Sequence, residues 1–239
     1  MAYYILTHRD VPNLDADFYK PLFLSNNETT IDLKVKDYYP DLANMNLLYN
    51  ELSGIYWIWK NDSDKFKGQC QYRMRPELTK DEIERILEVH KFILHTDYVG
   101  SIKAQFIGCH DKTCETWNLL RSVLKDLGSA TDTQMDIWER YNLLFSRNTF
   151  YAKAEDYDAF CNWLWPILDE LRKRLNFNTM DDVKAWAEKN NGLGTVEFRE
   201  RLFGFISERL FTLFAISNYT GDQLFVPKFK WTNEQLPLG

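Results

Sequence analysis

Apolar runs in the first hundred residues predict strands that alternate with helices. Residues 2–8 (AYYILTH) are apolar and aromatic and end in polar residues, which is typical of a first buried strand. Residues 29–35 (TTIDLKV) alternate apolar with polar positions and predict a second strand. Residues 66–74 predict a third strand, and residues 91–100 predict a buried fourth. The intervening segment 9–23 is rich in Asp, Pro and Asn and is expected to be a loop.

Apolar positions at helical spacing separate these strands. From Asn44 to Trp59 they predict an amphipathic helix with a wide buried face. Gly54 inside it costs about 1 kcal/mol of helix propensity, which indicates close packing against a neighbour. Capping-box patterns at Thr79–Glu82 and Thr131–Gln134 predict the starts of two more helices.

The second half of the chain is predicted to be mainly helical. A helix is expected over 112–127, and the clearest helical pattern covers 155–175, where Pro166 is expected to cause a kink. Residues 199–217 are apolar nearly all round, so this helix should be buried. Strands are predicted at 143–152 and, as a final edge strand containing Pro, at 224–229.

Alternating strands and helices imply an α/β sheet with substantial parallel pairing. The chain has no internal repeat and no low-complexity linker, so one domain over residues 1–239 is preferred. It would comprise an α/β part, 1–153, and a helical part, 154–239, with the last edge strand. Ligands of such sheets bind at the carboxyl ends of strands, so function is expected at His8–Arg9, Tyr72–Arg75 and Asp97.

Composition and charge limit the classes of molecule that the protein is expected to bind. The net charge of −6 and the pI of about 5.3 argue against a nucleic-acid binder and do not support electrostatic attachment to an anionic membrane. Aromatic residues make up 15 % of the 239 residues, enough for an aromatic core or for flat faces that stack against sugars and bases.

The cysteines and the apolar segments indicate a cytoplasmic protein. Cys70, Cys109, Cys114 and Cys161 form no repeated CxxC pattern, so reduced thiols are expected. The N-terminus lacks a signal-peptide pattern, and no segment approaches the roughly 20 apolar residues that a membrane helix needs.

Several familiar sites have no sequence signal. There is no GxGxxG, Walker A or Gly-x-Ser-x-Gly motif. Cys109, His110 and Cys114 lie close together, but one such cluster without a second pair is weak evidence for zinc. Asp15-x-Asp17 and Asp62-x-Asp64 have the spacing that holds Mg²⁺ or Mn²⁺ against a diphosphate, although such pairs also arise by chance in acidic chains.

Arginines provide the stronger candidate site. If residues 72–75 end a strand, Arg73 and Arg75 point to the same face and can bind one phosphate or carboxylate; the alternative is a pair of solvated or helix-pairing arginines. Arg201, Gly204 and Glu208 share one face of the last long helix, either as an internal ion pair or as residues that line a site.

Three segments together resemble a known family. NELSGIYWIWKN, GQCQYRM and RLFGFISERL are similar to the signature of small bacterial glycosyltransferases of capsule, exopolysaccharide and lipopolysaccharide gene clusters, which reads roughly ELTGLYWIWKN, GLCHYRRYF and R-x-x-GFxxERL. Asn148–Phe150 resembles the N-M-F element of that family, CNWLWPIL its next helix and YYILTHRD its opening strand. The resemblance spans nearly the whole chain in order. The eleven-residue aromatic block and the ERL helix are its specific parts.

The chain departs from this pattern at one point. The family's His-Tyr-Arg-Arg-Tyr-Phe is Gln71-Tyr72-Arg73-Met74-Arg75-Pro76 here. If the family's His binds the donor or acts as an acid or base, Gln71 implies altered specificity or weakened activity. Arg75, one residue along, could replace the missing second arginine.

The resemblance implies a GT-A-like hexosyltransferase that moves one sugar from a nucleotide-sugar donor to a surface-glycan acceptor, either a glycan or a lipid-linked glycan, in the cytoplasm or at the inner face of the cell membrane. Arg73 and Arg75 would stabilise the departing nucleoside diphosphate where related folds keep a metal motif, with Mg²⁺ or Mn²⁺ as the alternative. His8, Arg9 and Tyr72 would lie near the nucleotide, and Asp97 or Glu208 would take the proton of the acceptor hydroxyl. The other expected substrate-lining residues are Glu51, Lys60, Asn61, Gln71, Asn148 and Arg201.

Two other hypotheses stay open. Because of Gln71 and Met74, a glycan- or nucleotide-sugar-binding domain that has lost turnover remains an alternative. A helical interaction module with an aromatic core is the third, but it leaves the arginines at the strand end unexplained.

Overall fold

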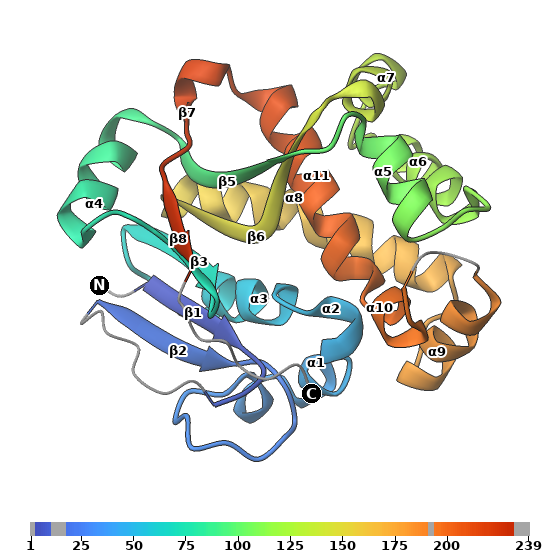
Figure 1. Cartoon of the computed structure of the whole chain (residues 1–239), viewed down its shortest axis with the longest axis horizontal. Coiled ribbons are helices and arrows are strands. Elements are labelled where there is room, and N and C mark those ends of the chain that lie inside the picture. Colours follow the sequence, from blue (N-terminus) through green and yellow to red (C-terminus); the bar gives the residue numbers. More distant parts are fainter. Residues whose placement is uncertain (1–2, 11–17, 191–193, 232–239) are drawn as a thin grey trace.

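The computed structural model describes residues 3–10, 18–190 and 194–231 and has a mixed α/β architecture (Figure 1). The strands are β1 (Tyr3–Thr7), β2 (Tyr19–Phe23), β3 (Phe66–Gln71), β4 (Met74–Pro76), β5 (Phe92–Tyr98), β6 (Leu143–Lys153), β7 (Leu224–Phe225) and β8 (Phe229–Trp231). Within the described residues the main sheet has six strands in the order β2-β1-β3-β6-β5-β7, and β4 pairs with β8 in a second sheet. β6 runs antiparallel to its neighbours β3 and β5, and the other pairs of the main sheet are parallel. The predicted α/β sheet is confirmed.

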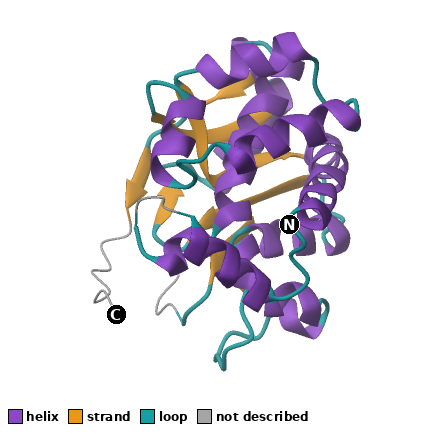
Figure 2. Ribbon diagram, turned by 90° about the vertical axis from the view of Figure 1, so that its right-hand side faces the viewer, coloured by secondary structure: helices purple, strands orange, loops and turns teal. Residues whose placement is uncertain are grey.

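Helices cover both faces of this sheet (Figure 2). The helices are α1 (Pro40–Asn44), α2 (Asn46–Tyr49), α3 (Leu52–Asn61), α4 (Lys80–Val89), α5 (Ile102–Cys109), α6 (Glu115–Asp126), α7 (Asp132–Arg140), α8 (Ala154–Arg174), α9 (Met180–Lys189), α10 (Val196–Glu200) and α11 (Leu202–Asn218), with 3₁₀ turns at Val35–Asp37 and Gly221–Gln223. The larger core lies between one face and α3, α8 and α11, and contains Tyr4 and Leu6 of β1. The smaller core lies between the other face and α4, and contains Tyr3 and Ile5. β1 is therefore buried on both faces, which explains its nearly continuous apolar sequence.

Local sequence signals predicted several elements correctly. Thr79 and Thr131 form the predicted capping boxes of α4 and α7. A Cβ on Gly54 would lie 2.5 Å from Leu6 Cδ2, so the predicted close packing of α3 against the sheet is confirmed. α8 continues through Pro166, and α11 is buried along most of its length.

Other predictions were wrong where distant parts of the chain meet. Residues 19–23 form the edge strand β2 rather than a loop, since an edge tolerates Pro21. The strand predicted at 29–35 is replaced by a single bridge, Phe23 to Lys34, and the 3₁₀ turn that follows. The helical pattern of 180–189 was not recognised as α9.

Three predicted elements are divided into shorter ones. The helix predicted over 44–59 is split into α1, α2 and α3, with Asn50 in the left-handed region at φ 50°. The strand predicted over 66–74 ends at Gln71, and the chain turns at Tyr72 and Arg73 before β4 begins. The last edge strand is likewise two short strands, β7 and β8, in different sheets.

The directions of the strands determine which edge of the sheet carries their carboxyl ends. β1, β2, β3 and β5 run the same way, so their carboxyl ends meet at one edge, which we call the carboxyl edge. β6 runs the other way and bulges there: the β5–β6 register shifts between Leu94 and Thr96, and Arg147 and Asn148 have φ of 65° and 49°. Among the described helices, none has both the length and the apolar character to cross a membrane.

Candidate functional site

A cavity of about 370 Å³, the strand-end cavity, opens at the carboxyl edge. It lies between the ends of β1, β2 and β3, the α1–α3 segment and the α10–α11 junction. Four residues predicted from the sequence line it: His8, Glu51, Tyr72 and Arg201. The fold thus brings together residues from four separate segments of the chain.

Tyr72 lines this cavity, and its ring contacts His8, Arg9 and Arg73. Its ring is 7 % exposed, and the His8 ring meets it edge-on with the centroids 5.6 Å apart. The guanidinium carbons of Arg9 and Arg73 lie 5.6 and 5.2 Å from its centroid, within cation–π range. Three of the predicted donor-binding side chains therefore surround one aromatic ring.

Positive charge is concentrated around His8. Desolvation by the surrounding residues, followed by the charges of Arg9, Arg201 and Arg73, lowers the pKa of His8 to about 4. The side chain keeps contact with solvent, so at neutral pH it is an accessible, uncharged hydrogen-bonding group. We call Arg9, Arg73 and Arg201 the arginine cluster.

The arginine cluster is free of carboxylate partners in the part of the chain that the structure describes. Arg201 donates through Nε to Asn50 Oδ1 at 2.9 Å, and Arg9 Nη2 lies 3.3 Å from His8 Nε2. Guanidinium groups suit phosphate oxygens because they donate in a planar fork. Together the three groups form a site suited to a diphosphate.

Arg75 does not belong to this cluster. It lies in β4 opposite Lys230, and its charge acts on Cys70 and Tyr19 in the smaller core. The expectation that Arg73 and Arg75 share one strand face was wrong, because the chain turns at Arg73. Tertiary structure instead places Arg9 and Arg201 beside Arg73.

Asparagines that sequence reasoning missed line the rest of the strand-end cavity. Asn50 donates to Leu47 O at 3.0 Å in its left-handed conformation, which Asn tolerates better than most residues. Asn26 donates to Asn44 across the cavity wall. The density of Asn between positions 26 and 50 was the available signal. The asparagines that line the cavity are Asn26, Asn27, Asn44, Asn46 and Asn50.

A second cavity, of about 280 Å³, contains both predicted catalytic carboxylates, Asp97 and Glu208. We call it the carboxylate cavity. Glu208 Oε1 accepts the backbone N–H of Arg147 at 2.6 Å, and Oε2 lies 3.2 Å from Arg209 Nη1. Burial raises the pKa of Glu208 to about 7, although the charge of Arg209 and the Arg147 hydrogen bond act in the opposite direction. The ion-pair partner of Glu208 is therefore the buried Arg209, not Arg201.

Asp97 lies in a chain of polar contacts. Ser146 Oγ donates to Asp97 Oδ2 at 2.8 Å, and His95 Nδ1 lies 2.8 Å from the same hydroxyl. Arg147 Nη2 lies 3.5 Å from Asp97 Oδ2, and its guanidinium stacks on Trp231 at 4.7 Å. Burial, with a smaller effect of Arg147, lowers the pKa of His95 against the effect of Asp97.

The two cavities are neighbours. The guanidinium of Arg201 lies 5.5 Å from the Phe205 ring, and Phe205 stacks at 4.0 Å on His110, which lines the carboxylate cavity. The charge of Glu51, in the strand-end cavity, contributes to the raised pKa of Glu208. A ligand bound at the arginine cluster would therefore lie next to two carboxylates.

The other predicted substrate-lining residues divide into two groups. Gln71 lies at the carboxyl edge and donates to Glu51 Oε1 at 2.8 Å. Asn148 is buried, donates to Gly204 O at 3.2 Å and accepts from Ser207 Oγ at 2.8 Å, so its amide joins the β6 bulge to α11. Lys60 and Asn61 lie at the far end of α3 from Glu51, about 14 Å along the helix.

The metal candidate Asp62–Asp64 lies away from the arginine cluster. Asp62 and Asp64 precede β3, at the edge opposite the arginine cluster, and Asp15 and Asp17 lie outside the described residues. His110 packs against two phenylalanine rings, Phe198 and Phe205, which also contact each other. Nowhere in the described ranges do three His, Cys, Asp or Glu side chains gather in a way that could hold a metal ion. Three guanidinium groups would also repel a cation, so the residues at this cluster do not fit Mg²⁺ or Mn²⁺.

Comparison with known proteins supports the fold. The apo structure of the bifunctional glycosyltransferase WbbM aligns with this chain at a TM-score of 0.71 and 20 % sequence identity, over 97 % of this chain and 45 % of WbbM. The chain has the fold of part of a glycosyltransferase and spans less than half of the length of that protein. No curated protein matches the sequence. The profile of a domain of unknown function, DUF4422, matches residues 2–219, and the chain therefore belongs to the DUF4422 family.

Proposed function

We propose that the protein is a glycosyltransferase that moves one hexose from a nucleotide-sugar donor to a surface-glycan acceptor of the capsule, lipopolysaccharide or exopolysaccharide type, in the cytoplasm at the inner face of the cell membrane. The observation that carries the proposal is the arginine cluster around His8, next to a cavity with two carboxylates. The fold shared with part of a bifunctional glycosyltransferase supports it.

In this proposal the strand-end cavity binds the donor. Arg9, Arg73 and Arg201 contact the diphosphate and stabilise the negative charge that develops as the bond between the anomeric carbon and the diphosphate oxygen breaks. Neutral His8 donates a hydrogen bond to the nucleotide or accepts one from it. The asparagine side chains supply the donors and acceptors that a base and a ribose need.

Glu208 is the proposed general base. Its pKa of about 7 makes it a stronger proton acceptor than an ordinary carboxylate while leaving much of it ionised at neutral pH. It takes the proton of the acceptor hydroxyl as that oxygen attacks the anomeric carbon, and the nucleoside diphosphate leaves with the electron pair of the broken bond. Asp97, held by Ser146 and Arg147, is the proposed partner that positions the acceptor.

The first experiment measures nucleoside-diphosphate affinity and sugar transfer with a panel of nucleotide sugars, each with and without Mn²⁺. Arg73→Ala should weaken nucleoside-diphosphate binding by roughly 10- to 100-fold, since a hydrogen bond to a charged group contributes about 1.5–3 kcal/mol. Arg75→Ala is the matched control and should leave affinity unchanged. Equal affinity of both variants, or binding that requires Mn²⁺, would contradict the role of the arginine cluster.

The second candidate is a nucleotide-sugar- or glycan-binding domain without turnover. Gln71 favours it. Its side-chain amide, which donates to Glu51, cannot transfer a proton as the histidine of the resembled signature could. Donor binding without hydrolysis or transfer, for every donor and acceptor tested, would favour this candidate over the enzyme.

A further inference from the structure

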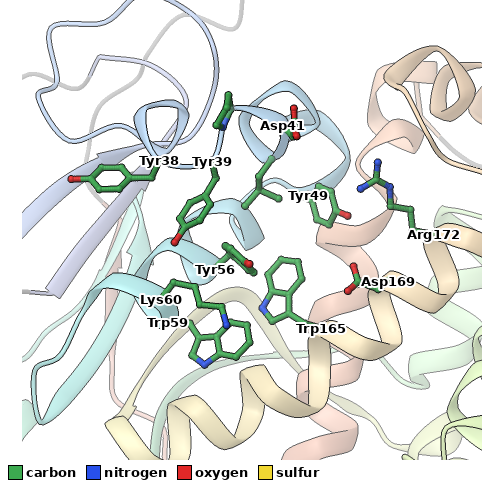
Figure 3. Close-up of a pocket in the computed structure, with 12 residues that line it drawn as sticks. Tyr38, Tyr39, Asp41, Tyr49, Tyr56, Trp59, Lys60, Trp165, Asp169 and Arg172 are labelled. Atoms are coloured by element: carbon green, nitrogen blue, oxygen red, sulfur yellow. The ribbon is translucent and has the colours of Figure 1, made fainter.

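A third cavity, of about 480 Å³, lies away from the carboxyl edge and is lined largely by aromatic rings (Figure 3). We call it the aromatic pocket. Its walls come from the residues before α1, from α1, α2 and α3, and from the second half of α8. It shares no lining residue with the strand-end cavity, and the short α1–α2 segment contributes to both. Its lining residues are Tyr38, Tyr39, Pro40, Asp41, Leu42, Tyr49, Tyr56, Trp59, Lys60, Trp165, Asp169 and Arg172.

The rings hold one another in a fixed arrangement. Tyr56 meets Tyr39, Trp59 and Trp165 at interplanar angles of 87°, 81° and 82°, with centroids 5.0, 5.7 and 4.7 Å apart. Edge-to-face packing of this kind is favourable and keeps flat apolar ring surfaces from stacking against each other. Such surfaces fit the C–H face of a pyranose ring.

The charged groups of the pocket balance. Asp41 and Asp169 oppose Lys60 and Arg172, and Figure 3 shows Asp169 and Arg172 on the α8 side with Lys60 across the pocket. A phosphate or a quaternary ammonium group would meet a like charge here. A neutral ligand with several hydroxyl groups can instead donate to the carboxylates and accept from the cations.

Trp165 adds an unused hydrogen-bond donor. The residue is 7 % exposed, and its indole Nε1 is buried with no acceptor. Figure 3 shows this nitrogen on the side of Trp165 that faces Tyr56 and Trp59, the two rings over which Lys60 lies. A buried donor without an acceptor is unfavourable, so an oxygen supplied by a ligand would improve this site.

Lys60 covers the position that a ligand would take. Its Nζ lies 3.3 Å from the Trp59 ring centroid and 5.7 Å from that of Tyr56. An ammonium group cannot accept the Trp165 proton. The side chain is exposed, so it can swing out into solvent and uncover the face of Trp59.

We propose that the aromatic pocket binds a neutral saccharide of one or two rings. The sugar stacks on Trp59 after Lys60 moves, one of its oxygens accepts the Trp165 N–H, and Asp169 accepts its hydroxyl protons. The size of the pocket is within the range of small-molecule sites. This site is separate from the proposed donor site and stands whether or not that site transfers sugar.

The test titrates ligands into the protein and measures binding by saturation-transfer NMR and by tryptophan fluorescence. The ligands are the neutral disaccharides maltose and lactose, their monosaccharides, glucuronate and inorganic phosphate. Trp165→Phe and Asp169→Asn should each weaken binding of the neutral sugar by about tenfold or more. Trp163→Phe is the matched control: its Nε1 donates to Ser129 O at 3.1 Å, outside the pocket, and its binding should equal that of the wild type. Lys60→Ala should bind at least as tightly as the wild type.

Two further measurements separate this site from the carboxyl edge. A nucleoside diphosphate should not displace the sugar, and Arg73→Ala should bind the sugar normally. The proposal is overturned if the folded wild type binds no neutral sugar, if it prefers glucuronate or phosphate, or if the nucleoside diphosphate competes. Trp165→Phe and Asp169→Asn variants that stay folded, by circular dichroism, and bind like Trp163→Phe would overturn it as well.

Discussion

Arg147 donates its backbone N–H to Glu208 Oε1 at 2.6 Å, and it does so because the β6 bulge holds Arg147 in a left-handed conformation. The same residue directs its guanidinium to Asp97. One bulged residue thus orients both carboxylates of the carboxylate cavity. Bulges next to sites commonly re-aim side chains in this way.

Glu208→Gln should lower the rate of sugar transfer by about 10²- to 10⁴-fold, the usual contribution of a general base, while leaving nucleoside-diphosphate affinity intact. In the wild type, transfer should rise with pH through the Glu208 pKa of about 7, as the carboxylate becomes the deprotonated base. A variant that keeps this pH dependence would show that another group is the base.

The same substitution should alter the pH dependence of stability. Folded Glu208 keeps its proton up to about pH 7, whereas the unfolded chain releases it near the ordinary value of 4.5. The folded state then binds more protons between these values, so the free energy of unfolding should fall as pH rises through this window, by roughly 3 kcal/mol. Urea denaturation at pH 5 and pH 8 should show a smaller fall for Glu208→Gln than for the wild type. Equal falls would argue against a raised pKa.

His8 should report the arginine cluster in an NMR titration. Its pKa of about 4 should rise in Arg73→Ala and in Arg201→Ala, because each loses a positive charge that disfavours the imidazolium. A bound nucleoside diphosphate should raise the pKa of His8 further by neutralising the cluster. Arg75→Ala, whose charge acts in the smaller core, should leave it unchanged. An unmoved His8 pKa in Arg73→Ala would mean that the two groups are not close.

Gly204→Ala should displace Asn50, which lines the strand-end cavity. A Cβ there would lie 2.8 Å from Asn50 Nδ2, so Asn50 must shift and its bond with Arg201 must weaken. We expect a loss of about 1–3 kcal/mol in the free energy of unfolding and weaker nucleotide binding. Gly108→Ala is the control: its Cβ meets nothing within 4 Å in α5, so it should gain up to about 1 kcal/mol. Both are measured by urea denaturation and by calorimetry with a nucleoside diphosphate.

Gln71→His tests the point at which the sequence departs from the glycosyltransferase signature that it resembles. A histidine there can still donate to Glu51 and can also transfer a proton. If Gln71 limits activity, the variant should transfer sugar several-fold faster with little change in donor affinity. A folded Gln71→His variant that transfers sugar no faster than the wild type would show that Gln71 does not limit activity.

Local sequence patterns predicted elements whose stability is local. The capping boxes of Thr79 and Thr131 and the apolar faces of α8 and α11 specify these helices because the groups that stabilise them are three or four residues apart. Gly54 could be interpreted because a glycine inside a helix needs a packing reason. The meeting of several strand ends at the carboxyl edge could be predicted because parallel strands end together.

Only tertiary structure decided which side chains meet at that edge. Arg9, Arg73 and Arg201 come from distant segments, and their convergence depends on strand order and on the α10–α11 junction packing beside Asn50. The turn at Arg73 and the left-handed residues of the β6 bulge break local patterns, since long-range contacts stabilise conformations that local propensity disfavours. Local sequence determined the capped helices α4 and α7, the amphipathic helices α8 and α11 and the α/β class of the fold. Packing between distant segments decided which charges share that edge, because proximity in space is not encoded by proximity along the chain.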